Sequence, residues 1–157
     1  MIRSILIGLV AGQRGISPLA SIALATRREV IPPILPLQAL LKNRFVAAGT
    51  AALAAAEMVG DKMKSAPDRI VPIGLAVRAV TAAYAGAALA PRDSNRAHAI
   101  IASTTALVSS YIGWRLRCAA MRRYGQTATG FVEDAIVLAS GILAANPDLV
   151  VEPAGGG

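Results

Sequence analysis

Most of the chain consists of five apolar segments, separated by short stretches that carry prolines and charged residues. The segments are rich in alanine, which favours helices, and none alternates with the period of two that is typical of a strand. A helix needs about 20 residues to cross the roughly 30 Å hydrocarbon core of a bilayer. We therefore expect an all-α, polytopic membrane helical bundle that forms one domain over residues 1–147. The expected helices span residues 2–26, 44–62, 70–90, 97–121 and 131–146, and residues 148–157 are expected to form a flexible C-terminal tail.

The composition agrees with a membrane location. Hydrophobic residues make up 55% of the chain and charged residues only 16%, against about a quarter charged in a typical soluble domain. Aromatic residues are 4% of the chain, so close packing must come from alanine and glycine, as it does between membrane helices. The net charge of +7 does not indicate nucleic-acid binding, because the cations stand between the apolar segments and are not interleaved with aromatic residues.

The first apolar segment shares features with a signal peptide, because Arg3 precedes an apolar stretch that contains small residues. Gln13 and Arg14 interrupt this stretch where a signal sequence is most apolar, so we interpret it as a retained helix. If every segment crosses the membrane, eight cations lie at the N-terminal side against six at the other, which favours a cytoplasmic N-terminus. The first group is Arg3, Lys62, Lys64, Arg69, Arg115, Arg117, Arg122 and Arg123, and the second is Arg27, Arg28, Lys42, Arg44, Arg92 and Arg96.

A few charged residues lie inside the apolar segments. A charge at the bilayer centre costs on the order of 2.5 to 3.5 kcal/mol on insertion scales, so such groups face the bundle interior and pair, or line a wet cavity. Arg14 lies near the middle of the first segment, and Glu57 and Asp61 share one face of the second. We expect Glu57 to neutralise Arg14, since a guanidinium can bind a carboxylate through two parallel hydrogen bonds. The expected intramembrane site consists of Arg14, Glu57, Asp61, Arg78, Glu133 and Asp134.

These charges have two interpretations. They can be ion pairs that fix the register of the helices, or they can line a pocket for an ion, a proton or an anionic headgroup. Gly8, Gly12 and Gly15 also have two interpretations. They can allow a close contact between helices, or together with Pro18 they can mark a break in the first helix near Arg14.

The sequence contains no metal, cofactor or catalytic motif that we recognise. His98 has no second histidine or cysteine at ligand spacing, so we interpret it as an interfacial residue and expect no metal. Cys118 is the only cysteine, which excludes an internal disulfide. Nucleotide-binding and hydrolase signatures are also missing from the sequence. We therefore expect no cofactor and assign no catalytic residue.

Four stretches, GLVAGQRGISPLA, AAAEMVGDKMKSAPDR, GLAVRAVTAAYAGAAL and EDAI, together resemble a family of small bacterial integral membrane proteins, the domain of unknown function 4126. The resemblance extends from about residue 5 to residue 145. It implies a multi-pass protein of the bacterial inner (cytoplasmic) membrane, but the family brings no activity that can be transferred. The residues to which the resemblance points are Gly8, Gly12, Arg14, Pro18, Glu57, Asp61, Lys62, Pro67, Arg69, Arg78, Glu133 and Asp134.

Three functions are compatible with these observations. The first is a small transporter or channel-like protein for an ion, a proton or a small anion, with its pocket lined by the charged residues. The second is an accessory or structural subunit that packs against a larger membrane complex or against copies of itself. The third is an enzyme acting on a lipid phosphate, which comes last because no nucleophile or metal site is recognisable. The expected partners are the lipid bilayer and other membrane protein chains, and not nucleic acid.

Overall fold

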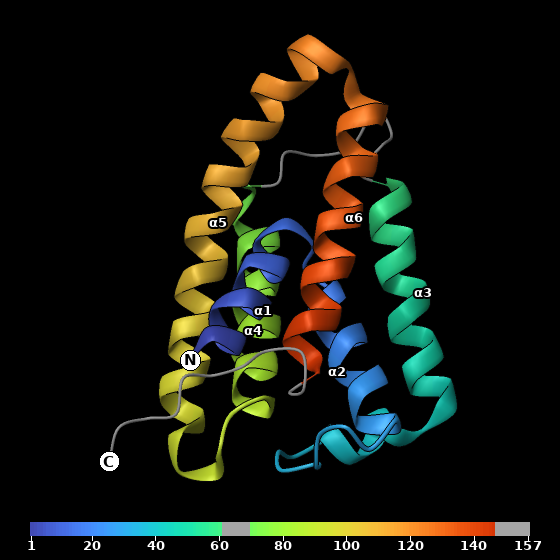
Figure 1. The fold of residues 1–157 in the computed structure, drawn as a ribbon, viewed down its shortest axis with the longest axis vertical. Helices are drawn as coiled ribbons and strands as arrows, with labels where there is room; N and C mark the ends of the chain where they lie inside the picture. The colour runs from blue at the N-terminus through green and yellow to red at the C-terminus, as the bar shows by residue number, and fades with distance from the viewer. Residues whose placement is uncertain (61–69, 147–157) are drawn as a thin grey trace.

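The computed structural model describes residues 1–60 and 70–146, and within these ranges the chain contains helices and connecting loops but no strand (Figure 1). The predicted all-α fold is confirmed. Asp61, Lys62, Pro67 and Arg69, together with the predicted tail, lie outside the described residues. The helices are α1 (Ile2–Gln13), α2 (Ser17–Arg27), η1 (Gln38–Lys42), α3 (Arg44–Gly60), α4 (Pro72–Ala88), η2 (Arg92–Ser94), α5 (Asn95–Tyr124) and α6 (Gln126–Ala145).

The first apolar segment is two helices and not one. α1 ends at Gln13, and Arg14 after it has an extended backbone with φ −140° and ψ 113°. α2 begins at Ser17 with Pro18 in its first turn. A proline has no N–H to donate, so it suits the first turn of a helix but interrupts a longer one. The structure therefore contains the break in the first helix that one of the two sequence interpretations predicts.

α1 and α2 form a hairpin whose two outer ends lie at the same end of the bundle. Arg3, at the start of α1, donates hydrogen bonds to the carbonyl oxygens of Ala144 (2.8 Å) and Ala145 (3.3 Å) at the end of α6. Arg28, just after α2, lines a groove together with the same Ala145. The turn between the two helices contacts Asp134, well inside α6. The first segment therefore does not run from one end of the bundle to the other, as the single predicted helix over residues 2–26 would.

The hairpin changes the cation count that predicts the orientation. That count places Arg3 at the opposite end of the bundle from Arg27 and Arg28. In the structure Arg3 lies at their end, beside the last turn of α6. Moving Arg3 from the predicted group of eight cations to the group of six leaves the two groups equal. The predicted cation count then no longer favours a cytoplasmic N-terminus.

The last two helices are longer than predicted. α5 continues to Tyr124 and ends at Gly125, whose φ of +82° is a conformation that glycine adopts without strain. α6 begins directly afterwards at Gln126 and not at residue 131, because the polar run before Phe131 forms its first turns. As a consequence, the acidic pair of α6 lies about two turns inside the helix.

The interior of the bundle is packed closely through small residues. Alanines form most of the buried apolar cluster. A Cβ atom on Gly8 would lie 2.6 Å from the carbonyl oxygen of Ala102, and one on Gly12 would overlap the hydroxyl of Ser109. Gly8 and Gly12 therefore allow α1 to lie directly against α5. Gly15 is different, because a Cβ atom there would meet its nearest neighbours at 3.4 Å, and it belongs to the hairpin turn.

The loop between α2 and η1 is held by one buried amide that sequence analysis did not single out. Gln38 is fully buried, and its Oε1 accepts hydrogen bonds from the backbone N–H groups of Ile34 (3.0 Å) and Leu35 (3.2 Å). Its Nε2 donates to the hydroxyl of Thr26 at 3.3 Å. These bonds satisfy backbone groups that the three nearby prolines leave outside any regular helix.

The outside of the bundle is apolar, whereas many of its buried side chains are polar. Phe45, Ile73 and Val80 are 71%, 73% and 69% exposed, while the Arg14 side chain is 1% exposed. Soluble domains show the reverse preference. Within the described ranges one helical stretch, Thr127–Ala145 of α6, is both long and apolar enough to cross a membrane, with a mean hydropathy of 1.5. α1 and α4 are apolar but shorter.

Candidate functional site

Arg14 lies at the tip of the hairpin and is the most deeply buried charged residue in the described part of the chain. Its Nε and Nη2 both donate to Oδ1 of Asp134, at 3.0 Å and 2.5 Å. Its Nη1 donates to the carbonyl oxygen of Gln13 at 3.2 Å and lies 3.9 Å from Oε1 of Glu133. The positive charge is therefore balanced by the acidic pair of α6. The prediction that Glu57 neutralises Arg14 is wrong.

Glu57 instead binds the backbone of the hairpin turn. Its Oε1 accepts a hydrogen bond from the N–H of Gly15 at 2.7 Å, and its Oε2 accepts one from the N–H of Ile16 at 2.9 Å. The turn precedes the N-terminus of α2, where N–H groups lack intrahelical partners and carry a partial positive charge. A carboxylate from α3 thus caps a helix to which it is not covalently adjacent.

The backbone conformation of Arg14 explains why Arg14 pairs with Asp134 and not with the predicted Glu57. Because Arg14 is extended and not helical, its side chain turns toward α6, while the N–H groups of the next two residues turn toward α3. A continuous helix, as predicted, leaves no unsatisfied N–H groups at this point for Glu57 to bind. With a continuous helix, Glu57 is the first carboxylate inside an apolar segment after Arg14, and so the sequence favours it as the partner.

Glu133 links the hairpin to α5. Its Oε2 accepts a hydrogen bond from Nη1 of Arg117 at 3.0 Å, while its Oε1 faces Arg14. Four side chains therefore form a row of alternating charges that joins α6, the hairpin and α5. We call this row the charge chain, and its members in order are Asp134, Arg14, Glu133 and Arg117. The side chain of Arg117 is only 7% exposed.

Arg117 is a site residue that sequence analysis missed. It was assigned to the cations outside the apolar segments, because the fourth segment becomes polar near this point. α5 continues as a helix to Tyr124, so Arg117 lies two turns inside it and faces α6. The signal available in the sequence was the unbroken helix-forming run up to Gly125, which contains no proline or glycine after Gly113.

Arg78 also lies at the hairpin tip. It is buried on α4, and its Cγ would be 3.4 Å from a Cβ atom on Gly15. The structure thus brings five predicted site residues to one region, from the hairpin turn and from α3, α4 and α6: Arg14, Glu57, Arg78, Glu133 and Asp134. Asp61 lies outside the described residues.

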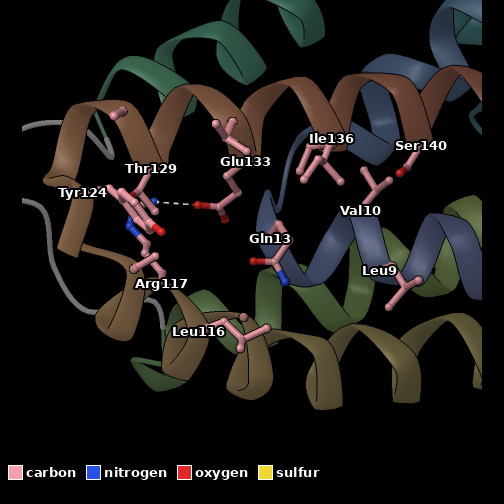
Figure 2. Close-up of a pocket in the computed structure, with 15 residues that line it drawn as sticks. Leu9, Val10, Gln13, Leu116, Arg117, Tyr124, Thr129, Glu133, Ile136 and Ser140 are labelled. Carbon is pink, nitrogen blue, oxygen red and sulfur yellow. Dashed lines mark hydrogen bonds and ion pairs between the residues drawn. The ribbon is translucent and has the colours of Figure 1, made fainter. Parts of the chain in front are cut away.

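A cavity of about 720 Å³ opens beside this cluster, between α5 and α6, with α1 at its inner side (Figure 2). Its walls are mainly apolar, with Leu9, Leu116 and Ile136 among them. Figure 2 shows Glu133 at the wall, directed toward Arg117. The side chain of Glu133 is 15% exposed against 1% for Arg14, so the cavity reaches the outer carboxylate of the charge chain while Arg14 is sealed behind it.

Two further expectations concern metals and His98. His98 is buried at the contact between α1 and α5, where its Nδ1 lies 2.7 Å from the hydroxyl of Ser4, so it is a packed polar residue and not an exposed interfacial one. Among the described residues, no group of three or more histidine, cysteine, aspartate or glutamate side chains could hold a metal ion. The charged cluster itself consists of carboxylates already paired with guanidinium or backbone N–H groups.

Comparison of the chain with protein-family models, with curated proteins and with solved structures gives no match. The resemblance to the domain of unknown function 4126 stays a prediction from the sequence stretches that carry it. The function must be inferred from the geometry of the hairpin, the charge chain and the cavity.

Proposed function

We propose that the chain is an integral membrane protein in which α3, α4, α5 and α6 cross the bilayer. The apolar outer faces and the buried charges support this arrangement, since lipid is the solvent that favours both. α3 and α4 have 17 residues each, or about 25 Å of helix, close to the thickness of the hydrocarbon core. α5 has 30 residues, or about 45 Å, which lets its charged ends reach both headgroup regions.

In this arrangement the α1–α2 hairpin enters the membrane and returns to the same side. Its helices have 12 and 11 residues, or about 18 Å and 16 Å, so its tip lies near the bilayer midplane. Backbone that leaves a helix at this depth is tolerated only where protein groups or enclosed water satisfy it. Glu57 satisfies two N–H groups of the tip, and the charge chain encloses Arg14.

The function that this geometry supports best is transport of a small anion together with a proton. The observation that carries it is the position of Glu133, which lies between two guanidinium groups at the wall of a cavity. When Glu133 takes up a proton it loses its charge, and its ion pair with Arg117 weakens. Arg117 can then bind an anion that enters the cavity, so protonation and anion binding favour each other. Broken helices with charged groups at their tips build such sites in transporters.

A transport assay tests the proposal. The purified protein is reconstituted in liposomes that contain a pH-sensitive dye, and inward gradients of phosphate, sulfate or a short alkylsulfonate are applied. We expect at least one of these anions to drive proton entry faster than in empty liposomes, and Glu133→Gln to abolish the coupling. Glu29→Gln is the control, because the Glu29 carboxylate is 81% exposed and pairs with Lys42 far from the cavity. Absence of flux for every anion, or equal flux in Glu133→Gln, contradicts transport.

The accessory role keeps one observation in its favour. The cavity between α5 and α6 has apolar walls, and an apolar helix of another membrane protein or of a second copy could occupy it. This role predicts a stable complex in mild detergent that Leu116→Trp, at the cavity wall, disrupts. The accessory role is contradicted if light scattering shows that the extracted protein is a monomer with no other polypeptide attached.

A further inference from the structure

A second hollow, of about 480 Å³, lies between α2, α3 and α6. We call it the alanine groove, because Ala47, Ala48 and Ala51 form its α3 wall, while Leu138 and Ile142 contribute to its α6 wall. α3 buries only Ala54 among its residues and packs chiefly against α2 and η1. The space between α3 and α6 is therefore left unfilled by the described protein groups. In a bilayer an apolar molecule has to occupy it.

Among the described residues that line the groove, the cations lie at one end. Arg27 and Arg28, at the end of α2, line it and are exposed. In the described ranges neither guanidinium has a hydrogen bond or an ion pair, and the neighbouring carboxylate of Glu29 is directed to Lys42 at 3.7 Å. Two adjacent guanidiniums without carboxylate partners are suited to a phosphate, which accepts paired hydrogen bonds from arginine.

The length of the groove matches one leaflet of a bilayer. It follows α2 from Ser17 at the hairpin tip to Arg28. The 11 residues of α2 give about 16 Å, against about 15 Å for half of the hydrocarbon core. Its cationic end thus coincides with the headgroup level and its apolar end with the midplane. A transmembrane helix of a partner would extend through both leaflets, whereas a lipid acyl chain ends at the midplane.

We propose that the alanine groove binds one anionic phospholipid, with its phosphate on Arg27 and Arg28 and an acyl chain along the alanines of α3. The inference rests on the proposed membrane location but not on transport. The bound lipid fills the gap beside α3 and so holds Glu57, which α3 carries, against the hairpin tip. Anionic lipid is therefore part of the structure that keeps the charged site assembled.

Native mass spectrometry of the detergent-purified protein, titrated with phosphatidylglycerol or phosphatidylcholine, tests this. We expect phosphatidylglycerol to bind at one site and phosphatidylcholine at least tenfold more weakly. The double variant Arg27→Gln/Arg28→Gln should lower phosphatidylglycerol affinity about 30-fold, since each cation near a membrane surface contributes roughly a factor of five. Lys42→Gln/Arg44→Gln removes two exposed cations outside the groove and should change the affinity no more than twofold.

A second pair of variants tests the acyl-chain contact without changing charge. Ala51→Trp fills the groove and should prevent lipid retention, while Ala52→Trp, at an exposed position of α3 that does not line it, should not. Equal binding of the two lipids, equal loss in both charge variants, or unchanged retention in Ala51→Trp overturns the proposal. A dimer that Ala51→Trp dissociates would identify a second copy as the occupant instead. Recovery of the protein in the soluble fraction without detergent would refute the membrane location itself, which is a separate outcome.

Discussion

Replacing Asp134 by asparagine tests the charge chain at its most buried link. The substitution keeps the shape of the side chain and one acceptor oxygen but leaves the Arg14 charge without its closest counterion. Removing one partner of a buried ion pair costs about 3–5 kcal/mol. We expect a loss of about 3 kcal/mol in the free energy of unfolding, at the low end of that range, because Glu133 at 3.9 Å and the Gln13 carbonyl at 3.2 Å still contact Arg14.

Equilibrium unfolding in detergent micelles, followed by the fluorescence of Trp114, measures this change, since Trp114 is the only tryptophan. Glu29→Gln is the matched control. It breaks the exposed Lys42–Glu29 pair at 3.7 Å, and exposed pairs contribute about 0–1 kcal/mol.

The double variant Arg14→Met/Asp134→Leu separates a buried unpaired charge from a general packing defect. It removes both charges of the pair, and we expect it to recover most of the lost free energy of unfolding, because apolar replacement of a whole buried pair is often neutral. The reasoning is refuted if Asp134→Asn is as stable as Glu29→Gln. It is equally refuted if the double variant is no more stable than Asp134→Asn.

Two further predictions concern the contacts of the hairpin. Gly12→Ala should destabilise the protein by about 1–3 kcal/mol, since the added methyl overlaps α5. Gly49 has open space around it, so Gly49→Ala should stabilise α3 by about 0.5–1 kcal/mol. Unfolding titrations of the two variants measure both changes. Glu57→Gln should accelerate hydrogen exchange at the backbone N–H of Gly15, because the charged acceptor that caps the turn is lost; an unchanged exchange rate there would disprove the capping role.

The sequence predicts the helices well and the connections between them less well. Alanine-rich apolar runs bounded by prolines and charges define α3 and α4 to within about two residues. The hairpin was open to prediction as a break, because Pro18 and the glycines around Arg14 indicate one. The direction of α2 could not be predicted from the sequence. A break fixes neither the angle between two helices nor the end of the bundle to which the second helix returns.

The membership of the charged cluster was largely predictable, but its pairing was not. Arg14 and Asp134 are identified by their positions alone, because they are charged residues inside apolar segments. Which carboxylate contacts which donor depends on backbone conformation at the turn. The extended Arg14 exposes two N–H groups that bind Glu57, and this leaves Asp134 for the guanidinium. The sequence does not single out Arg117, because it stands among the cations that flank the fourth segment, whereas α5 directs it to Glu133.

The most direct test of the membrane bundle is the environment of its exposed apolar faces. Val80 on α4 is 69% exposed and far from both ends of its helix. A spin label can be placed there by Val80→Cys in a Cys118→Ser background, with the protein reconstituted in liposomes. We predict frequent collisions with oxygen, which concentrates in the hydrocarbon core, and few with a water-soluble nickel chelate. Frequent collisions with the nickel chelate would mean that this face is in water, and would contradict the lipid-embedded arrangement.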